Sequence, residues 1–130
     1  MIAAQLSGSD EIEVWGDGEQ TRSFMYIDDC LQGTLRLMDS AVEEPINIGS
    51  DQLVTINQLV DIVEQIAGVN LKRRYKLDAP KGVRGRNSDN TLIRQRLDWA
   101  PSTRLEEGMR QTYEWILSEM IRAEPRRLFA

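Results

Sequence analysis

Short strand-like segments alternate with amphipathic helical segments along the chain, and glycine or proline separates most of them. This alternation is typical of domains in which helices pack against short strands. With 130 residues, the chain is long enough for one domain with a modest core but shorter than a typical two-domain enzyme. The pattern therefore predicts an α/β domain of small, α+β-like build, with short strands and three to four helices.

Four runs with β-type composition are predicted to form strands, at residues 12–15, 23–27, 46–49 and 71–77. The last run alternates apolar and basic side chains, which is typical of a charged strand at the edge of a sheet. Gly16 and Gly18 flank Asp17 directly after the first run. Because glycine readily adopts positive φ, this triplet predicts a tight turn.

Apolar residues spaced three and four apart predict the end of a helix at 2–6 and helices at 29–39, 55–67, around 92–97 and after 103. Asp28 is expected to be the N-cap of the helix at 29–39. Thr55 with Gln58, and Thr103 with Glu106, have the spacing of capping boxes. Ser88 or Asp89 is expected to cap the short helix over 92–97.

Pro125 is expected to end the last helix, because proline lacks the N–H that a helix interior needs. The predicted domain therefore comprises residues 1–123, and residues 124–130 are predicted to form a loose tail.

The chain contains no histidine and a single cysteine, Cys30. An internal disulfide and a Ser-His-Asp or Cys-His catalytic unit are therefore excluded, and a zinc site is improbable. No apolar run approaches the roughly 20 residues that span a bilayer, and the first ten residues do not resemble a secretory signal. We therefore expect a cytoplasmic protein without a membrane partner, in which Cys30 is a buried, inert thiol.

Nine of the 16 basic residues lie between Lys72 and Arg96, together with only two acidic residues. This window carries a net charge of +7, whereas the whole chain carries −5. The acidic total argues against nucleic-acid binding, and the basic residues lie on a predicted strand and loop rather than on one groove-reading helix. The local positive charge of the window is still compatible with binding of a small anionic ligand.

The most suggestive part of this window is the loop 81–86. Gly82 and Gly85 leave backbone N–H groups accessible, and Arg84 and Arg86 supply guanidinium groups just before a predicted helix. All of these features favour phosphate. The same composition also suits a solvated surface loop, and the residues alone do not separate the two interpretations.

Arg22 stands just before a predicted strand, where it could project into a cleft. Pairing with Asp17 or Glu19 is the simpler interpretation. Asp28 and Asp29 are adjacent and do not face each other on a helix, so capping is favoured over a catalytic pair. The glycine turn lacks the third glycine of a dinucleotide-binding fingerprint, and none of the three tyrosines has a lysine four residues later.

Four ordered blocks resemble the NAD-dependent sugar-nucleotide epimerases and dehydratases of the extended short-chain dehydrogenase family. The first block spans 15–29 and contains Gly-Asp-Gly followed by Arg22, Phe24 and Asp28; the others are 46–50, 82–90 and 97–101. Block 82–90 is particularly similar to the GDP-mannose epimerases of the family. The resemblance covers about residues 12–116, and four blocks at family-like spacing are far more specific than one glycine motif.

The resemblance implies a C-terminal, substrate-binding domain that closes over a nucleotide diphosphate sugar. It gives Arg22 a contact with the diphosphate, and it places Arg86 and Ser88 against the diphosphate or the nucleotide, with Arg84 nearby. Asp28 and Asn47 have structural roles in the family. NAD and the catalytic tyrosine and lysine belong to a separate N-terminal domain, so no cofactor and no catalytic residue is expected in this chain.

The matched blocks begin more than halfway along the family pattern. The first hypothesis is therefore an orphan or truncated nucleotide-sugar binding domain of GDP-mannose type, which is not catalytically competent alone. A second is an interaction or self-assembly module, which forms a homo-oligomer or docks on a separately encoded Rossmann partner. A third is a gene whose coding region starts further upstream.

Overall fold

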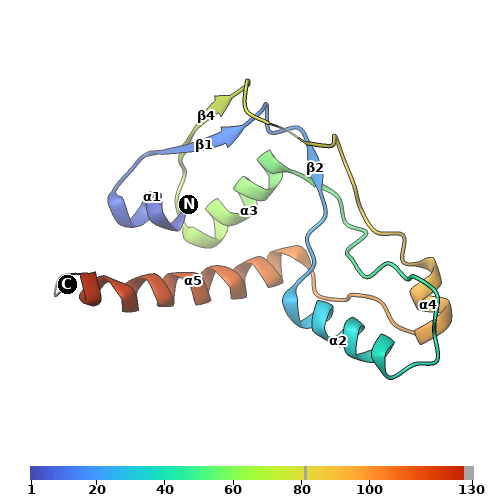
Figure 1. The fold of residues 1–130 in the computed structure, drawn as a ribbon. Coiled ribbons are helices and arrows are strands. Elements are labelled where there is room, and N and C mark those ends of the chain that lie inside the picture. The colour runs from blue at the N-terminus through green and yellow to red at the C-terminus, as the bar shows by residue number, and fades with distance from the viewer. Residues whose placement is uncertain (81, 128–130) are drawn as a thin grey trace.

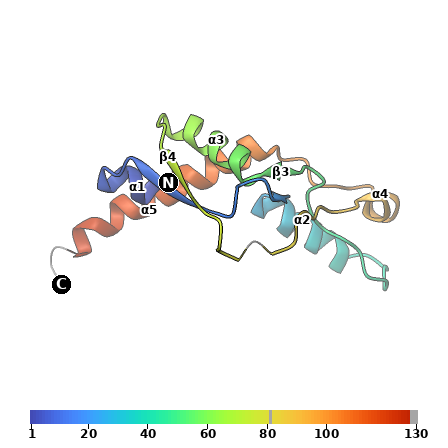
Figure 2. The same ribbon diagram turned by 90° about the horizontal axis from the view of Figure 1, so that it is seen from above.

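The computed structural model describes residues 1–80 and 82–127, with side chains up to residue 123. Within this part, the chain forms five helices and two small sheets, so the predicted mixed α/β class is confirmed (Figures 1 and 2). In chain order, the elements are α1 (Ile2–Ser7), β1 (Glu11–Trp15), β2 (Thr21–Arg22), α2 (Ile27–Met38), β3 (Val54–Thr55), α3 (Ile56–Ala67), β4 (Lys72–Lys76), α4 (Thr91–Leu97) and α5 (Leu105–Arg127).

The larger sheet pairs β1 with β4 in parallel, and Glu11 lies opposite Lys72. The predicted strand at 71–77 is thus confirmed. In the same register Glu13 lies opposite Arg74, and Arg74 Nη2 is 3.0 Å from a Glu13 carboxylate oxygen. Ion pairs between exposed side chains add little to the stability of the fold. Pairing β1 with β4 one residue out of register would, however, turn charged side chains toward the buried face and separate these pairs. Opposite charges therefore help to select this register.

The helix α3 forms as predicted. The Gln58 N–H donates to Thr55 Oγ1 at 3.0 Å, and the Thr55 N–H donates to Gln58 Oε1 at 2.8 Å, which completes the capping box. Gly68 ends the helix in the left-handed conformation, with φ of 66°. The helix packs on α5. The buried apolar side chains are Ile2, Val14, Val54, Val60, Leu71, Ala79, Ile93, Leu105 and Tyr113.

A buried acid joins α3 to the sheet. Glu64 accepts a hydrogen bond from the Leu71 N–H at 2.8 Å and one from Arg73 Nη2 at 3.0 Å. The hydrogen bond from Arg73 to Asp61 raises the pKa of the guanidinium above its ordinary value; burial opposes this rise, and Glu64 adds to it. Arg73 therefore stays charged and holds β4 against α3.

The helices α2 and α4 lie at the opposite end of the molecule from α1 and the sheet (Figure 1). Asp29 is buried, and its Oδ2 accepts a hydrogen bond from the Thr103 N–H at 2.9 Å. This bond ties α2 to the chain that enters α5. Among the described residues, no helix is long and apolar enough to cross a membrane.

Two strand predictions were wrong. None of the residues 23–27 forms a strand: the short strand β2 ends before them, at Arg22, and the chain is already helical at Ile27. Residues 46–49 form no strand. Their apolar composition favours β structure, but within the described residues neither run has a neighbouring strand to complete its backbone hydrogen bonds.

Three predicted helix ends also differ. Tyr26 rather than Asp28 is the N-cap of α2, so Asp28 lies in the first turn, where a carboxylate still stabilises the helix dipole. The helix α5 begins at Leu105, two residues after Thr103, because the Thr103 backbone bonds to Asp29. It continues past Pro125 to Arg127, so the expected stop was wrong by two residues. The remainder of the expected tail, 128–130, lies outside the described residues.

Gly33 provides a test of the packing at this end. A Cβ at this position would lie 2.6 Å from Trp99 Cζ3 and 2.9 Å from Ile48 Cγ2. We expect Gly33→Ala to lower the free energy of unfolding, because overpacking costs roughly 1–3 kcal/mol and the gain in helix propensity is about 1 kcal/mol. Urea denaturation measures the change. Arg36→Ala, in the same helix but exposed, serves as the control. An unchanged or higher stability of Gly33→Ala would refute the packing.

Asp89 marks the start of α4. Asn90 is the N-cap and makes no side-chain capping bond, whereas Asp89 Oδ1 accepts from the Thr91 N–H at 2.9 Å. This hydrogen bond lowers the pKa of Asp89 below its ordinary value. The predicted capping role is therefore performed by Asp89, from one position before the cap.

We expect the Asp89 carboxyl to titrate below pH 3.8 in an NMR titration of the folded protein. Because its pKa is lower in the folded than in the unfolded state, the stabilisation is present above about pH 4 and is lost as the pH falls through the folded value. The stability difference between wild type and Asp89→Ala should therefore narrow in acid. A difference independent of pH would contradict this assignment.

Candidate functional site

The glycine turn after β1 is locked onto α3. Gly16 and Gly18 have φ of 79° and 77°, which requires glycine. A Cβ on Gly18 would lie 2.3 Å from Asn57 Oδ1, so the amide of Asn57 occupies that space. Asn57 Nδ2 donates to the Asp17 carbonyl at 3.2 Å and to Glu19 Oε1 at 2.7 Å. The turn thereby directs the following residues toward the loop after β4.

We call residues 82–90 the glycine loop; Lys81, which was predicted as part of it, lies outside the described residues. Thr21 meets the start of this loop. Its N–H donates to the Arg84 carbonyl at 3.0 Å, and its hydroxyl donates to the same carbonyl at 3.4 Å. A Cβ on Gly85 would lie 2.4 Å from Thr21 Oγ1, so glycine permits this close approach.

Arg22 also reaches the glycine loop. Its Nη1 donates to the Thr21 carbonyl at 2.6 Å and to the Val83 carbonyl at 2.7 Å, and the side chain is half-buried. Gly82 has φ of +66°, and a Cβ there would lie 3.4 Å from Arg22 Nη2. The sequence did not show that Arg22, four residues after the glycine turn, would bond to a loop 60 residues further along the chain.

The other end of the glycine loop is held by residues 49–51. Asn90 is 3% exposed, and its Nδ2 donates to the Gly49 carbonyl at 2.8 Å. The Ser88 N–H donates to the Ser50 carbonyl at 3.1 Å, and Asn87 Nδ2 donates to the Asp51 carbonyl at 3.2 Å. Three consecutive carbonyls thus anchor one segment.

Ser88 is a proposed substrate contact whose hydroxyl already has a partner. Its Oγ donates to Asn90 Oδ1 at 2.7 Å, which orients the amide toward Gly49. A Cβ on Gly49 would lie 2.9 Å from the Ser88 Cβ. This contact explains why the second and third sequence blocks belong together. Sequence analysis assigned no role to Asn90, although this residue lies in the block 82–90.

Arg84 and Arg86 lie in the glycine loop between the contacts with Thr21 and Arg22 at one end and those with residues 49–51 at the other. Both side chains are exposed, and neither guanidinium has a hydrogen-bonding or ionic partner within the described part of the chain. The structure therefore brings all four predicted site residues to one loop and its supports. Arg22 and Ser88 hold bonds within the protein, and Arg84 and Arg86 present unpaired cations.

A hollow of ≈ 310 Å³ adjoins the loop, lined by Asp17, Glu19, Gln20, Gly82, Val83 and Arg84. Its two carboxylates would repel phosphate. Among the described residues, no group of three or more cysteine and acidic side chains is placed to hold a metal ion.

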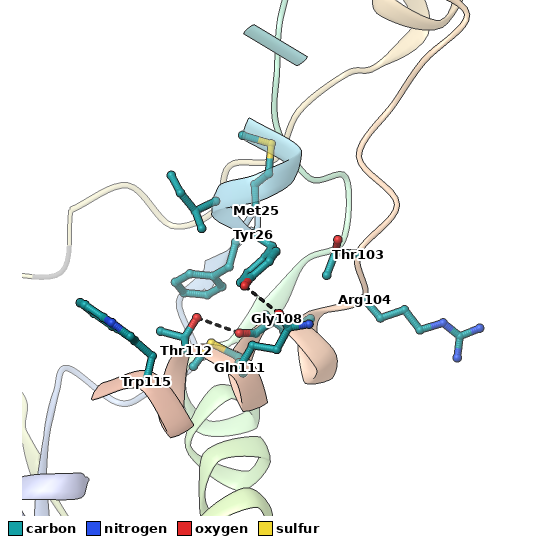
Figure 3. A pocket seen from close by; sticks show the side chains of 12 residues that line it. Met25, Tyr26, Thr103, Arg104, Gly108, Gln111, Thr112 and Trp115 are labelled. Atoms are coloured by element: carbon teal, nitrogen blue, oxygen red, sulfur yellow. Dashed lines mark hydrogen bonds between the residues drawn. The ribbon is translucent and has the colours of Figure 1, made fainter. Parts of the chain in front are cut away.

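A second cavity, of ≈ 570 Å³, lies between the start of α2 and the first turns of α5 (Figure 3). Its walls are mostly apolar, and Tyr26 donates a hydrogen bond across it to Gln111 Oε1 at 2.8 Å. The lining residues are Phe24, Met25, Tyr26, Ile27, Thr103, Arg104, Leu105, Gly108, Met109, Gln111, Thr112 and Trp115. Sequence analysis did not predict this cavity, because its two walls are more than 70 residues apart in the chain.

The cavity continues into an exposed apolar stripe on α2. Ile27, which lines the cavity, is 58% exposed, and Leu31, Leu35 and Met38 follow at 54%, 59% and 73%. The helical spacing of the last three was predicted correctly, but within this structure the stripe does not pack into the core. We call these four side chains, together with Trp115, the apolar face. Cys30, on the same helix, is half-buried rather than fully buried.

Residues 1–112 match the family model described as GDP-mannose 4,6 dehydratase. GDP-mannose 3,5-epimerase of Arabidopsis thaliana is 50% identical over 117 residues, which cover 90% of this chain and 30% of that protein. The chain spans about a third of the length of the curated relatives that it matches.

Solved structures agree with these matches. UDP-glucose 4-epimerase of Thermotoga maritima, solved with UDP-glucose, superposes with a TM-score of 0.83 at 32% identity, covering 92% of this chain and 38% of that one. UDP-glucuronic acid 4-epimerase of Bacillus cereus, solved with UDP-glucuronic acid and NAD, gives 0.79 at 28% identity, with coverage of 88% and 37%. The chain belongs to the GDP-mannose 4,6-dehydratase family, among the NAD-dependent sugar-nucleotide epimerases and dehydratases with the extended short-chain dehydrogenase fold.

Proposed function

We propose that this chain forms the nucleotide-sugar binding domain of an epimerase or dehydratase, and that its ligand is of the GDP-mannose type. One observation carries the proposal: Arg84 and Arg86 are unpaired cations on a loop that hydrogen bonds hold at both ends. The 50% identity to a GDP-mannose 3,5-epimerase supports this choice of nucleotide sugar.

The diphosphate is the part of the ligand that suits these residues. A guanidinium offers paired N–H donors that match two phosphate oxygens, and bonds between charged groups are stronger than neutral ones. The anchored loop also loses little conformational entropy when it binds, because its backbone is already fixed. Since the chain is acidic overall, this attraction is local rather than a property of the whole surface.

The proposal assigns no cofactor contact to the described residues. NAD is present in the solved Bacillus cereus relative. At the Gly-x-Gly turn of the described residues, the amide of Asn57 lies against Gly18. NAD would supply the redox chemistry of such an enzyme. We assign substrate contacts to Arg84, Arg86 and their supports, and no catalytic step to any of them.

The apolar face favours a second role, as a docking surface. We propose that it packs against an NAD-binding domain of the kind that completes the relatives. The matched relatives contain about twice as much additional polypeptide as this chain covers. Four large apolar side chains form one exposed stripe next to a cavity of ≈ 570 Å³. Exposure of such a contiguous apolar patch to water is unfavourable, and patches of this kind mark interaction surfaces.

Calorimetric titration with GDP-mannose and GDP tests the first role. We expect weak binding that Arg84→Ala and Arg86→Ala each reduce by about tenfold or more, because each removes a hydrogen bond between charged groups. Arg110→Ala, an exposed arginine of α5, removes the same charge elsewhere and serves as the control. An absence of binding at millimolar ligand would refute the role, as would an equal loss in the control.

Copurification tests the docking role. The partner is the part of Arabidopsis GDP-mannose 3,5-epimerase that this chain does not match, with its folding checked by circular dichroism. We expect a 1:1 complex that Leu31→Glu and Leu35→Glu weaken, because each buries a charge against an apolar partner. Leu77→Glu, at a site 66% exposed beyond β4, should leave the complex intact.

Two results would contradict this assignment. The first is concentration-dependent dimers of the chain that the same two substitutions abolish, since the occupant of the apolar face would then be a second copy. The second is the absence of any complex with a folded partner.

A further inference from the structure

The cavity of ≈ 570 Å³ between the start of α2 and the first turns of α5, here called the α2–α5 cavity, adjoins the apolar face. The two features share Ile27 and Trp115, which line the cavity and belong to the face. A protein that docks on the apolar face therefore lies over the cavity as well. What the docked protein places in the cavity depends on the chemistry of its walls.

Gly108 allows the two walls of the cavity to meet. This residue is buried in α5, and a Cβ on it would lie 3.1 Å from Tyr26 Cδ2 and 3.2 Å from Tyr26 Cβ. The tyrosine side chain therefore lies directly against the α5 backbone, and its hydroxyl donates to Gln111 Oε1 at 2.8 Å. A close contact and a hydrogen bond thus hold the two walls together, so the cavity is formed before any partner binds.

The hydroxyl groups of Tyr26 and Thr112 are engaged within the protein. The Tyr26 hydroxyl donates to Gln111, and the Thr112 hydroxyl donates to the Gly108 carbonyl at 2.7 Å (Figure 3). The same view shows the Arg104 guanidinium pointing away from the cavity. An occupant therefore meets mostly apolar surface. This disfavours a phosphate or a sugar, because burying a polar group without a hydrogen bond costs free energy.

The apolar walls suit an aromatic ring. Met25 and Met109 line the cavity, and methionine sulfur makes favourable contacts with aromatic rings. Phe24 also lines it, and Trp115, which is 65% exposed, stands at one end of the cavity in Figure 3. Pairs of aromatic rings add to the binding free energy beyond the area that they bury. An aromatic side chain therefore gains more here than an aliphatic one of similar size.

We propose that the α2–α5 cavity is a socket for an aromatic side chain of the NAD-binding domain that docks on the apolar face. This inference rests on the docking role proposed above, and it adds where the strongest contact of that interface lies. Binding energy at protein interfaces is concentrated in a few large side chains that fill pockets. The relatives contain about twice as much additional polypeptide as this chain covers, which is the polypeptide that would supply such a side chain.

Phenol tests the socket in the isolated chain. We expect it to bind with a dissociation constant on the order of 1 mM, because an apolar cavity takes up small aromatic molecules. Saturable shifts of the Met25 and Met109 methyl resonances in NMR spectra report this binding. Cyclohexanol, which has the same hydroxyl on an aliphatic ring, should bind at least about threefold more weakly. The absence of phenol binding, or equal binding of the two alcohols, would overturn the proposal.

Thr112→Phe separates the socket from the stripe on α2. The substitution fills the cavity from its α5 wall, keeps every side chain of the apolar face and adds apolar surface. We expect it to abolish phenol binding and to weaken the complex with the unmatched part of Arabidopsis GDP-mannose 3,5-epimerase by about tenfold or more. Gln65→Phe adds the same ring at an exposed position of α3 and should change neither. Circular dichroism checks that both variants are folded.

The outcomes distinguish the socket from the docking role. A complex that Leu31→Glu weakens and Thr112→Phe leaves intact would overturn the socket, while the docking role stands. The absence of any complex with the folded partner would overturn the docking role and the socket with it. If Thr112→Phe does not fold, phenol itself provides the test: it should compete with the partner and weaken the wild-type complex, and a complex that saturating phenol leaves unchanged would overturn the socket.

Discussion

The arrangement of this molecule depends on the contact between Asn57 and Gly18. The amide of Asn57 occupies the space of a glycine Cβ and bonds to Asp17 and Glu19. Its N–H also donates to the Gly18 carbonyl at 3.0 Å, and its Oδ1 accepts from the Tyr75 hydroxyl at 3.0 Å. One side chain thus joins the glycine turn, the first turn of α3 and β4. Because β2 follows the turn directly, the same contact directs Thr21 and Arg22 toward the glycine loop.

Most of the basic side chains between residues 72 and 96 form ion pairs with acidic side chains. Lys72 pairs with Asp10, and Arg74 pairs with Glu13 of β1. Arg73 pairs with two acidic side chains of α3. Arg94 pairs with Asp51, and Arg96 pairs with Glu44. Arg84 and Arg86 have no such partner among the described residues. Five of the nine basic residues of the window are thus paired with acids, whereas within the described part of the chain the two arginines of the glycine loop are not.

Local signals predicted the elements whose cause is local. The capping box of Thr55 and Gln58 and the turn at Gly16 and Gly18 were both confirmed, since neighbouring atoms stabilise each of them. The failures depended on distant partners. Residues 23–27 have β-type composition but no adjacent strand, and the start of α5 moved because the Thr103 backbone bonds to the buried Asp29.

The sequence by itself determined the fold class, the family blocks and the chemistry of the glycine loop, because periodicity, glycine positions and arginine content are properties of the chain alone. Only the tertiary structure decided which of the four site residues carry free charge and which hold the loop. Arg22 and Val83 are 61 positions apart, and Asn90 and Gly49 are 41. No local pattern encodes such pairs, since they form only when the packing of α3, the turn and the two loops brings them within hydrogen-bonding distance.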